Sequence, residues 1–147
     1  MSITFNNLKS KTECDCLNGA NEDNQSTFCF VISKDSIRDK DFTSHWEKGK
    51  KPKKDSCESK CSYMSKSLSI VNTDLARETV LNTYKQLFKV APKYKNHVAD
   101  IQLRGQAGKV KHTPSNNNPY HVDFYKSDNF SLHCNIDVIN IIPLSDV

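Results

Sequence analysis

Two neighbouring segments near the C-terminus alternate apolar and polar residues, and this period of two constrains the fold more than any other feature. Within 120–125 and 130–138 the even-numbered residues are all apolar. Such alternation is typical of β-strands with one buried face. Ser127, Asp128 and Asn129 lie between the two segments and favour a turn. We therefore predict an antiparallel hairpin in this part of the chain.

The length of the loop fixes the register of this hairpin. A three-residue loop places Val122 opposite Cys134 and brings both apolar sets to one face, whereas a two- or four-residue loop would turn one strand over. In this register Asp123 lies across from His133. Residues in such a cross-strand pair are about 4.5–5.5 Å apart at Cβ, which is close enough for a carboxylate to orient an imidazole.

The polar face of the predicted hairpin is the candidate catalytic site. Two imidazoles and two carboxylates can supply a general acid and a general base, or nitrogen and oxygen ligands for a metal. The outer face of an antiparallel sheet is also expected to be polar without any catalytic role, so both interpretations stay open. No cofactor or metal site is predicted. The predicted catalytic residues are His121, Asp123, His133 and Asp137.

The remaining chain supplies helices and further strands. Residues from about 74 to 90 repeat apolar side chains at helical spacing, and Pro92 prevents the helix from continuing. Residues from about 39 to 48 form a shorter helical pattern. The run of β-branched and aromatic residues from Thr27 to Ser33 predicts a buried strand.

These elements predict an α+β fold, in which a mainly antiparallel sheet is packed by one long helix (about 74–90) and one short helix (about 39–48). A chain of 147 residues suits a single domain. Residues 1–26 are polar and are predicted to be a partly disordered lead-in, with the domain spanning 27–147. The segment 49–63 is predicted to be a Lys-rich loop.

The basic residues favour a docking role over base-specific recognition of DNA or RNA. The net charge is +4, and only three of the 21 basic residues are Arg, the residue that reads phosphate and guanine edges with a planar fork. Clustered Lys residues indicate either a partner-binding arm or a solvated loop. A protein partner is expected, and nucleic acid is an alternative partner. The predicted binding residues are Lys50, Lys51, Lys53, Lys54, Arg104 and Lys109.

Six cysteines allow three interpretations. Cys14 and Cys16 have one residue between them, and Cys57 and Cys61 have three, whereas paired zinc ligands usually have two. Disulfides would require an oxidising compartment. The N-terminal residues contain no apolar stretch typical of a secretory signal, which predicts a cytoplasmic protein. The sequence therefore favours reduced thiols without a common role, with structural zinc as the alternative.

Several classes of protein are excluded. No apolar run approaches the roughly 20 residues of a membrane-spanning helix. The Gly-rich segment 105–108 lacks the spacing of a phosphate-binding loop, and Val110 follows Lys109 where such a loop has Ser or Thr. A hairpin turn is the better interpretation of this segment.

Three short motifs carry a resemblance. They are the run 46–50 (Trp-Glu-Lys-Gly-Lys), the run 67–70 (Ser-Leu-Ser-Ile), and the run 133–136 (His-Cys-Asn-Ile) with Pro143 after it. In these motifs, scattered over about two-thirds of the chain, the sequence resembles a group of short uncharacterised bacterial proteins. The resemblance implies a bacterial cytoplasmic protein and brings no known activity with it.

The sequence as a whole predicts a small cytoplasmic binding or accessory protein that acts as a subunit or adaptor of a larger assembly. The alternative is a histidine-dependent hydrolase of phosphodiesters or nucleotides that uses the polar face of the hairpin.

Overall fold

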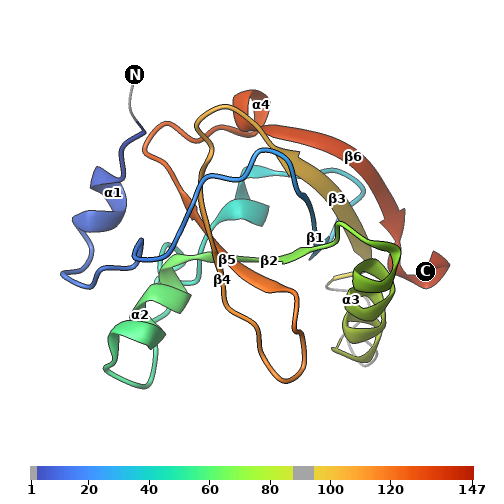
Figure 1. The fold of residues 1–147 in the computed structure, drawn as a ribbon, viewed down its shortest axis with the longest axis horizontal. Coiled ribbons are helices and arrows are strands. Elements are labelled where there is room, and N and C mark those ends of the chain that lie inside the picture. Colours follow the sequence, from blue (N-terminus) through green and yellow to red (C-terminus); the bar gives the residue numbers. More distant parts are fainter. Residues whose placement is uncertain (1–2, 88–94) are drawn as a thin grey trace.

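The computed structural model describes residues 3–87 and 95–147, and these residues form an α+β fold around one six-stranded antiparallel sheet (Figure 1). The strand order is β4-β5-β2-β1-β3-β6. No helix in the described part of the chain is long and apolar enough to cross a membrane. The strands are β1 (Thr27–Ile32), β2 (Lys66–Ile70), β3 (His97–Leu103), β4 (Gly108–His112), β5 (His121–Lys126) and β6 (Ile136–Pro143).

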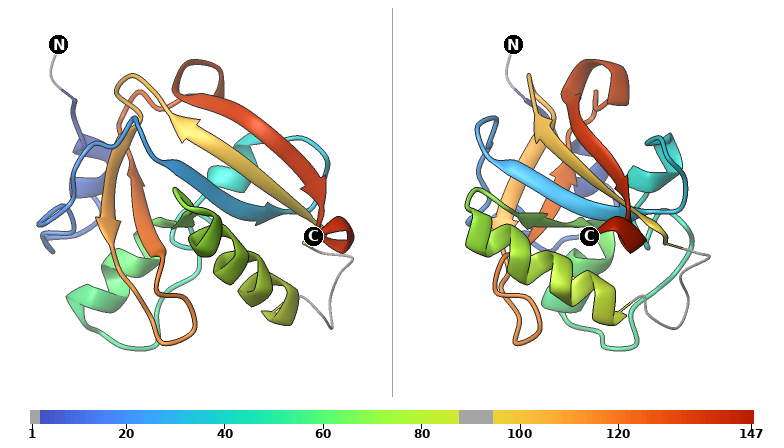
Figure 2. Two further views of the ribbon diagram at one scale, coloured as in Figure 1. Left: turned by 45° about the vertical axis from the view of Figure 1, so that its right-hand side comes forward. Right: turned by 90° about the vertical axis from the view of Figure 1, so that its right-hand side faces the viewer.

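Helices cover one face of the sheet, and a second core lies on the other. The four α-helices are α1 (Asn6–Lys9), α2 (Cys57–Met64), α3 (Asp74–Leu87) and α4 (Leu132–Asn135), and the 3-10 turns are η1 (Asp39–Phe42) and η2 (Leu144–Asp146). The sheet is strongly bent, so that β4 and β5 stand at a steep angle to β1, β3 and β6 (Figure 2).

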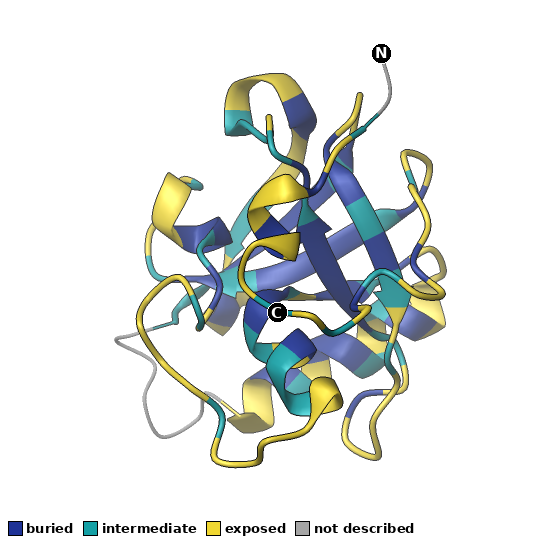
Figure 3. Ribbon diagram, turned by 90° about the vertical axis from the view of Figure 1, so that its left-hand side faces the viewer, coloured by how far each residue is buried: buried dark blue, intermediate teal, exposed yellow. Residues whose placement is uncertain are grey.

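Alternation along the strands produces these two cores. In β1, Phe28 and Phe30 enter a cluster with Leu68, Val122 and Phe124 on the face away from α3. The intervening residues of β1 point to the opposite face, where the side chains of α3 pack. The central strands are therefore buried on both faces, whereas most residues of the edge strand β6 are exposed (Figure 3).

The long helix is confirmed over its described residues. α3 begins after Thr73, whose hydroxyl accepts a hydrogen bond from the backbone N–H of Ala76 at 3.1 Å. Val80 and Tyr84 are buried against the sheet, as the helical spacing predicts. Leu87, which the pattern places in the core, is instead 58% exposed. Residues 88–90 of the predicted helix lie outside the described residues.

The predicted short helix over 39–48 is wrong in length. Only η1 is helical there, and it is followed by turns. The side chain of Asp41 accepts a hydrogen bond from the backbone N–H of Arg38 at 2.8 Å and so tightens this single turn. Phe42 is 1% exposed and packs against other aromatic rings of the core. This segment is therefore held to the core by the buried ring of Phe42, and not by the apolar face of a longer helix.

The predicted C-terminal hairpin is also wrong. β5 pairs with β2 and β4, whereas β6 pairs with β3. Residues 132–135 form α4, because the hydroxyl of Ser131 accepts from the N–H of Cys134 and the side chain of Asn135 accepts from the N–H of Ser131. The predicted hairpin turn over 104–109 is wrong too, since β3 and β4 are not neighbours in the sheet. Alternation predicts which residues share a face, but it does not select the partner strand.

The N-terminal segment is part of the fold. Phe5 and Leu8 are buried beside α2 and Tyr125. Two disulfides, Cys14–Cys57 and Cys16–Cys61, join this segment to α2. The expectation of reduced thiols without a common role is therefore wrong for these four cysteines.

The two free cysteines, Cys29 and Cys134, differ in their exposure. Cys29 is buried as predicted, whereas Cys134 is exposed because it lies in α4 and not in a strand. The predicted loop 49–63 ends early, since α2 begins at Cys57 after the capping hydroxyl of Ser56.

Candidate functional site: a basic cavity

A cavity of about 560 Å³ opens where two strands of the sheet separate. β1 and β2 pair at only two positions, Phe28 with Ile70 and Cys29 with Ser69. Beyond this point β2 continues along β5, whereas β1 continues along β3. The side chains that line the cavity come from both diverging strands, from the end of α3, and from the loops around residues 43–50 and 115–118.

The described lining of this cavity is positively charged and contains no carboxylate. A cavity with this lining attracts anions, because unpaired positive charges in a concave site raise the local concentration of negatively charged ligands. The positively charged or titratable basic side chains in the lining are His45, Lys48, Lys50, Lys66, Lys95 and His121.

Lys66 is the most strongly affected of these groups. Burial, together with the neighbouring amines of Lys95 and Lys48, lowers the pKa of its amine from the ordinary 10.5 to about 8. Asp41 opposes this effect, but its carboxylate also lies beside Arg38 at 3.8 Å. The Lys66 ammonium lies 5.2 Å from the centre of the Phe30 ring, and no described carboxylate forms an ion pair with it.

Two further groups in the lining are affected in the same direction. Burial lowers the pKa of Lys95, and nearby Lys48 contributes to the same shift. Burial also lowers the pKa of His45, with further contributions from Lys50 and other lysines of the cavity. These shifts indicate positive charges held together without sufficient counter-charge. A bound anion would relieve this repulsion.

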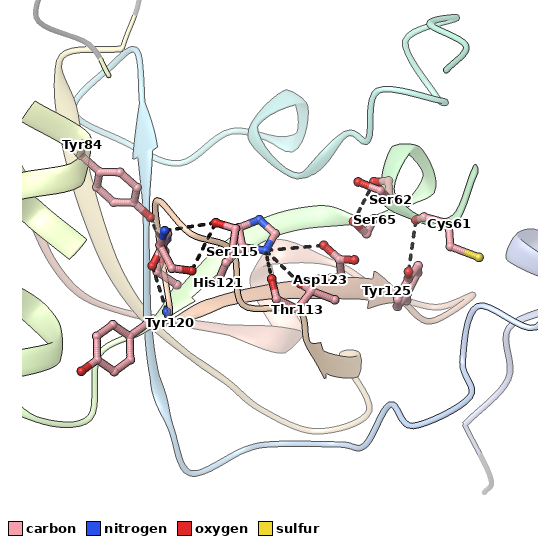
Figure 4. A network of polar contacts seen from close by, with 12 residues as sticks. Cys61, Ser62, Ser65, Tyr84, Thr113, Ser115, Tyr120, His121, Asp123 and Tyr125 are labelled. Carbon is pink, nitrogen blue, oxygen red and sulfur yellow. Dashed lines mark hydrogen bonds and ion pairs between the residues drawn. The ribbon is translucent and has the colours of Figure 1, made fainter. Parts of the chain in front are cut away.

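A chain of four hydrogen bonds forms the polar wall beside α3 (Figure 4). The amide of Asn118 donates to the hydroxyl of Ser69 at 2.8 Å, and this hydroxyl lies 2.8 Å from that of Tyr84. The Tyr84 hydroxyl donates to the carbonyl of Cys29 at 3.2 Å. The Asn118 carboxamide oxygen accepts from the N–H of Tyr120. The network therefore fixes the loop before β5 against β2 and α3.

Replacement of Tyr84 by Phe is expected to lower the free energy of unfolding by about 1–3 kcal/mol, because the buried carbonyl of Cys29 and the hydroxyl of Ser69 lose a partner. Urea denaturation measures this change. Tyr120→Phe is the matched control, since the Tyr120 hydroxyl has no hydrogen bond in the part of the chain that the structure describes, and it should change stability by less than about 0.5 kcal/mol. Equal losses for both variants would contradict the network.

His121 lies at the start of β5 and contributes its ring to the cavity. Its Nδ1 atom lies 2.9 Å from the hydroxyl of Thr113 and 3.2 Å from the carbonyl of Thr113 (Figure 4). A carbonyl can only accept, so Nδ1 carries the proton when it bonds there. Nε2 then keeps its lone pair, and none of the described residues forms a hydrogen bond with it. His121 is thus able to act as a base or to accept a hydrogen bond from a ligand.

Asp123 lies behind this imidazole. Its Oδ1 atom is 3.9 Å from His121 Nδ1, is buried, and has no hydrogen-bond partner among the described residues. Burial raises the pKa of the Asp123 carboxyl, although His121 and the hydroxyls of Ser65 and Thr113 oppose the effect. A buried carboxylate beside Nδ1 would stabilise the imidazolium that forms when Nε2 takes up a proton.

The structure brings together only part of the predicted catalytic set. His121 and Asp123 are adjacent, because residues two apart on a strand share a face. His133 is exposed on α4, and Asp137 forms an ion pair with Arg104 at 2.8 Å; neither lines the cavity. The predicted acid–base pair of two histidines is therefore wrong.

Of the six predicted binding residues, only one lines the cavity. Lys50 lines the cavity. Lys51 places its ammonium 3.4 Å from the centre of the Trp46 ring, and Lys53 and Lys54 are exposed. Arg104 holds α4 through the carbonyls of His133 and Cys134, and Lys109 lies 5.7 Å from the Phe5 ring.

The sequence pattern gave no signal for most of the cavity. Lys66 belongs to an alternating strand and Lys95 follows Pro92, so neither stands out from a chain rich in lysine. His45, a third such residue, lines the cavity as well. Only the loss of pairing between β1 and β2 brings these residues together, and the sequence does not encode that in a local pattern.

Because comparison with known proteins finds no relative, the functional proposal is based on the geometry of the cavity. No protein-family model matches the chain, and no curated protein or solved structure shows significant similarity to it.

Proposed function

We propose that this protein is a binding protein for a small phosphate-bearing molecule of the nucleotide or sugar-phosphate class. The observation that carries the proposal is the ammonium of Lys66, which is half-buried and has no described ion-pair partner, in a cavity whose described lining has further lysines and no carboxylate. An unpaired buried charge is unfavourable for folding, so its presence in a cavity favours a functional role.

The other walls of the cavity fit the rest of such a ligand. Serine hydroxyls and the Asn118 amide can donate to phosphate or sugar oxygens. Apolar side chains of Phe30, Leu68 and Leu87 provide a surface for a base or the carbon face of a sugar. The volume of about 560 Å³ lies within the range of about 300–1,000 Å³ common for small-molecule sites.

Calorimetric titration with ADP, AMP, ribose 5-phosphate and adenosine tests the proposal. We expect binding of the phosphate-bearing compounds and none of adenosine. Lys66→Met and Lys95→Met should each weaken binding about tenfold or more, which corresponds to about 1.4 kcal/mol. Lys53→Met is the matched control, because Lys53 is exposed and does not line the cavity. No binding by the wild-type chain, or equal weakening by Lys53→Met, would contradict the proposal.

The affinity should increase as the pH falls. Lys66 and His45 have lowered pKa values in the free protein, and a bound anion favours their charged forms. Binding is therefore coupled to proton uptake by Lys66 above about pH 8, so this contribution to the affinity grows as the pH falls toward about 8 and levels off below it. Titrations of ADP between pH 9.5 and 7 measure this effect. We expect tighter binding at the lower pH for the wild type, and a smaller change for Lys66→Met.

A second candidate function is hydrolysis of a phosphodiester or nucleotide with His121 as the general base. The observation that favours it is the fixed Nδ1 of His121, with Asp123 behind it and Nε2 without a described partner at the wall of the cavity. A base in this position could take a proton from an attacking water or hydroxyl, while the lysines of the cavity stabilise the phosphate charge.

His121→Gln should reduce such an activity by about 10²–10⁴-fold while the fold is kept. The assay uses RNA, DNA and nucleotides as a panel. His133→Gln is the control, because His133 is exposed on α4 and should leave the activity unchanged. A wild-type chain that binds nucleotides and hydrolyses nothing would leave the binding function and reject the hydrolase.

The disulfides bear on the location of the protein. The sequence predicts a cytoplasmic location, but disulfides are rare in the cytosol and persist in oxidising compartments. We therefore propose that the disulfide-bonded form works in an oxidising compartment. Thiol labelling of the protein from its native source should then modify Cys29 and Cys134 only, after unfolding. Labelling of all six cysteines would contradict this location.

A protein or nucleic-acid partner on the Lys-rich loop, within a larger assembly, stays a separate prediction. Lys51, Lys53 and Lys54 are exposed and available for it. Their replacement by Glu, together with Lys50, should abolish such docking. The resemblance to short bacterial proteins likewise stays a prediction.

A further inference from the structure

The basic cavity has two chemically different ends. At the lysine end, the amine of Lys95 acts electrostatically on that of Lys66, and both act on the imidazole of His45. At the other end, His121 of β5 lies opposite Ser69, three residues beyond Lys66 along β2. Three residues of a β-strand span about 10 Å. A ligand that fills the cavity therefore meets cations at one end and an imidazole with hydroxyls at the other.

The His121 end presents a hydrogen-bond acceptor. The Nδ1 atom of His121 lies 3.2 Å from the carbonyl of Thr113, which can only accept, so Nδ1 carries the proton in this contact. Nε2 of the same ring then has a lone pair, and none of the described residues donates a hydrogen bond to it. The His121 side chain is 27% exposed and lines the cavity. A ligand group that meets Nε2 should therefore be a donor.

Helix α3 supplies an apolar surface beside this acceptor. Tyr84 and Leu87 both line the cavity, and the Tyr84 hydroxyl lies 2.8 Å from that of Ser69. Leu87 is 58% exposed, although the helical pattern places it among the apolar residues of α3. A planar ring can pack on these carbon atoms while its edge meets the imidazole nitrogen.

We infer that the ligand is a nucleoside monophosphate whose base carries an exocyclic amino group, such as AMP or CMP; this inference rests on the proposed binding function. The phosphate lies at the lysine end, and the amino group of the base donates to Nε2 of His121. The exocyclic amines of adenine and cytosine are donors, whereas the oxygen atoms that replace them in hypoxanthine and uracil are acceptors. Two acceptors that face one another in a partly buried site leave both without a donor, which is unfavourable.

A sugar phosphate fits the two ends less well. In a nucleoside monophosphate the phosphate and the base lie on opposite sides of the ribose, so the molecule can reach both ends of the cavity. Ser67 and Ser69 line the cavity along β2 between the two ends and can bind the ribose hydroxyls. Ribose 5-phosphate lacks both the ring that packs on α3 and the amino group. We expect it to bind about tenfold more weakly than AMP, or weaker still.

Calorimetric titrations of the full-length chain with AMP, IMP, CMP and UMP at neutral pH test the inference. AMP and IMP differ only in the exocyclic group of the base and in the proton beside it, and CMP and UMP form a second such pair. We expect AMP to bind about tenfold or more tightly than IMP, and CMP to bind more tightly than UMP. Equal affinities within each pair would overturn the inference and leave the proposed binding function intact. Absence of binding by all four would overturn both.

Two histidine variants locate the contact, with circular dichroism as the measure of folding. His121→Gln should still bind AMP but bring the affinities for AMP and IMP to within about twofold of each other, because a carboxamide can present either an oxygen or an NH₂ group. His45→Gln is the matched variant at the lysine end, and it should weaken both nucleotides by the same factor and keep the preference for AMP. A preference that survives His121→Gln, or one that is lost in His45→Gln, would overturn the inference.

Discussion

Replacement of Lys66 by Met should raise the free energy of unfolding at pH 7 by about 1–3 kcal/mol and, in the same protein, abolish most of the affinity for phosphate-bearing ligands. The folded protein lowers the pKa of this amine from 10.5 to about 8, which sets an upper limit of about 3.5 kcal/mol at about 1.4 kcal/mol for each pKa unit. Met keeps an apolar stem near the Phe30 ring and removes the buried charge.

The pH dependence of the stabilisation identifies its cause. Above pH 8 the folded chain releases the Lys66 proton, whereas the unfolded chain holds it up to about 10.5. The unfolded state therefore binds more protons in this window, so the stability of the wild type rises with pH there. The advantage of Lys66→Met should be full below pH 8 and should shrink between pH 8 and 10.5.

Urea denaturation at pH 7 and at pH 10 measures this prediction. Lys53→Met is the control, because Lys53 is exposed and does not line the cavity, and it should change stability by less than about 0.5 kcal/mol at either pH. A destabilised Lys66→Met variant would show that the amine supports the fold and would remove the main support for the binding site.

Loss of both disulfides should lower the free energy of unfolding by about 5–6 kcal/mol. Each disulfide joins residues 43 or 45 positions apart, and closing a loop of that length corresponds to about 4 kcal/mol in the chain-entropy model. The two effects do not add in full. Once one bridge is closed, the second joins residues that are already held close together, so it contributes about 1–2 kcal/mol.

Three variants measure this non-additivity. Removing either Cys14–Cys57 or Cys16–Cys61 alone by double replacement with Ser should lower stability by about 1–2 kcal/mol, and removing both bridges should lower it by about 5–6 kcal/mol. Cys134→Ser, outside both bridges, should be nearly neutral. The two bridges join the same two segments of the chain, so each constrains nearly the same loop. If the losses of stability on removing each bridge alone added up to the loss on removing both, this account would be contradicted.

The sequence predicted the local elements better than their pairing. The strand near Thr27, the strand near Leu68 and the helix from Asp74 have regular apolar patterns, and the structure confirms each of them. The hairpin prediction failed because β5 pairs with β2 and β4, and β6 pairs with β3, so the two strands are not neighbours in the sheet. A period of two in the sequence carries no information on which strand is the partner in the sheet. In addition, the side chains of Ser131 and Asn135 form hydrogen bonds at the start of α4, so part of the alternating segment is helical.

The site was predictable only where it depends on one strand. His121 and Asp123 share a face of β5 whatever its partners are, so their proximity followed from the sequence. Lys66, Lys95 and His45 come from separate segments and meet only because β1 and β2 diverge. The paired cysteines were missed for a similar reason, since four distant positions meet only after the N-terminal segment packs on α2.

The pKa of the Lys66 amine, followed by NMR of carbon-13 beside the nitrogen of each lysine, tests the central claim most directly. We expect an amine that titrates at about 8 in the free protein, is lost in Lys66→Met, and moves toward 10.5 when ADP is added. An amine of Lys66 that titrates near 10.5 in the free protein, or a pKa that saturating ADP leaves unchanged, would contradict the account of a cavity that binds anions.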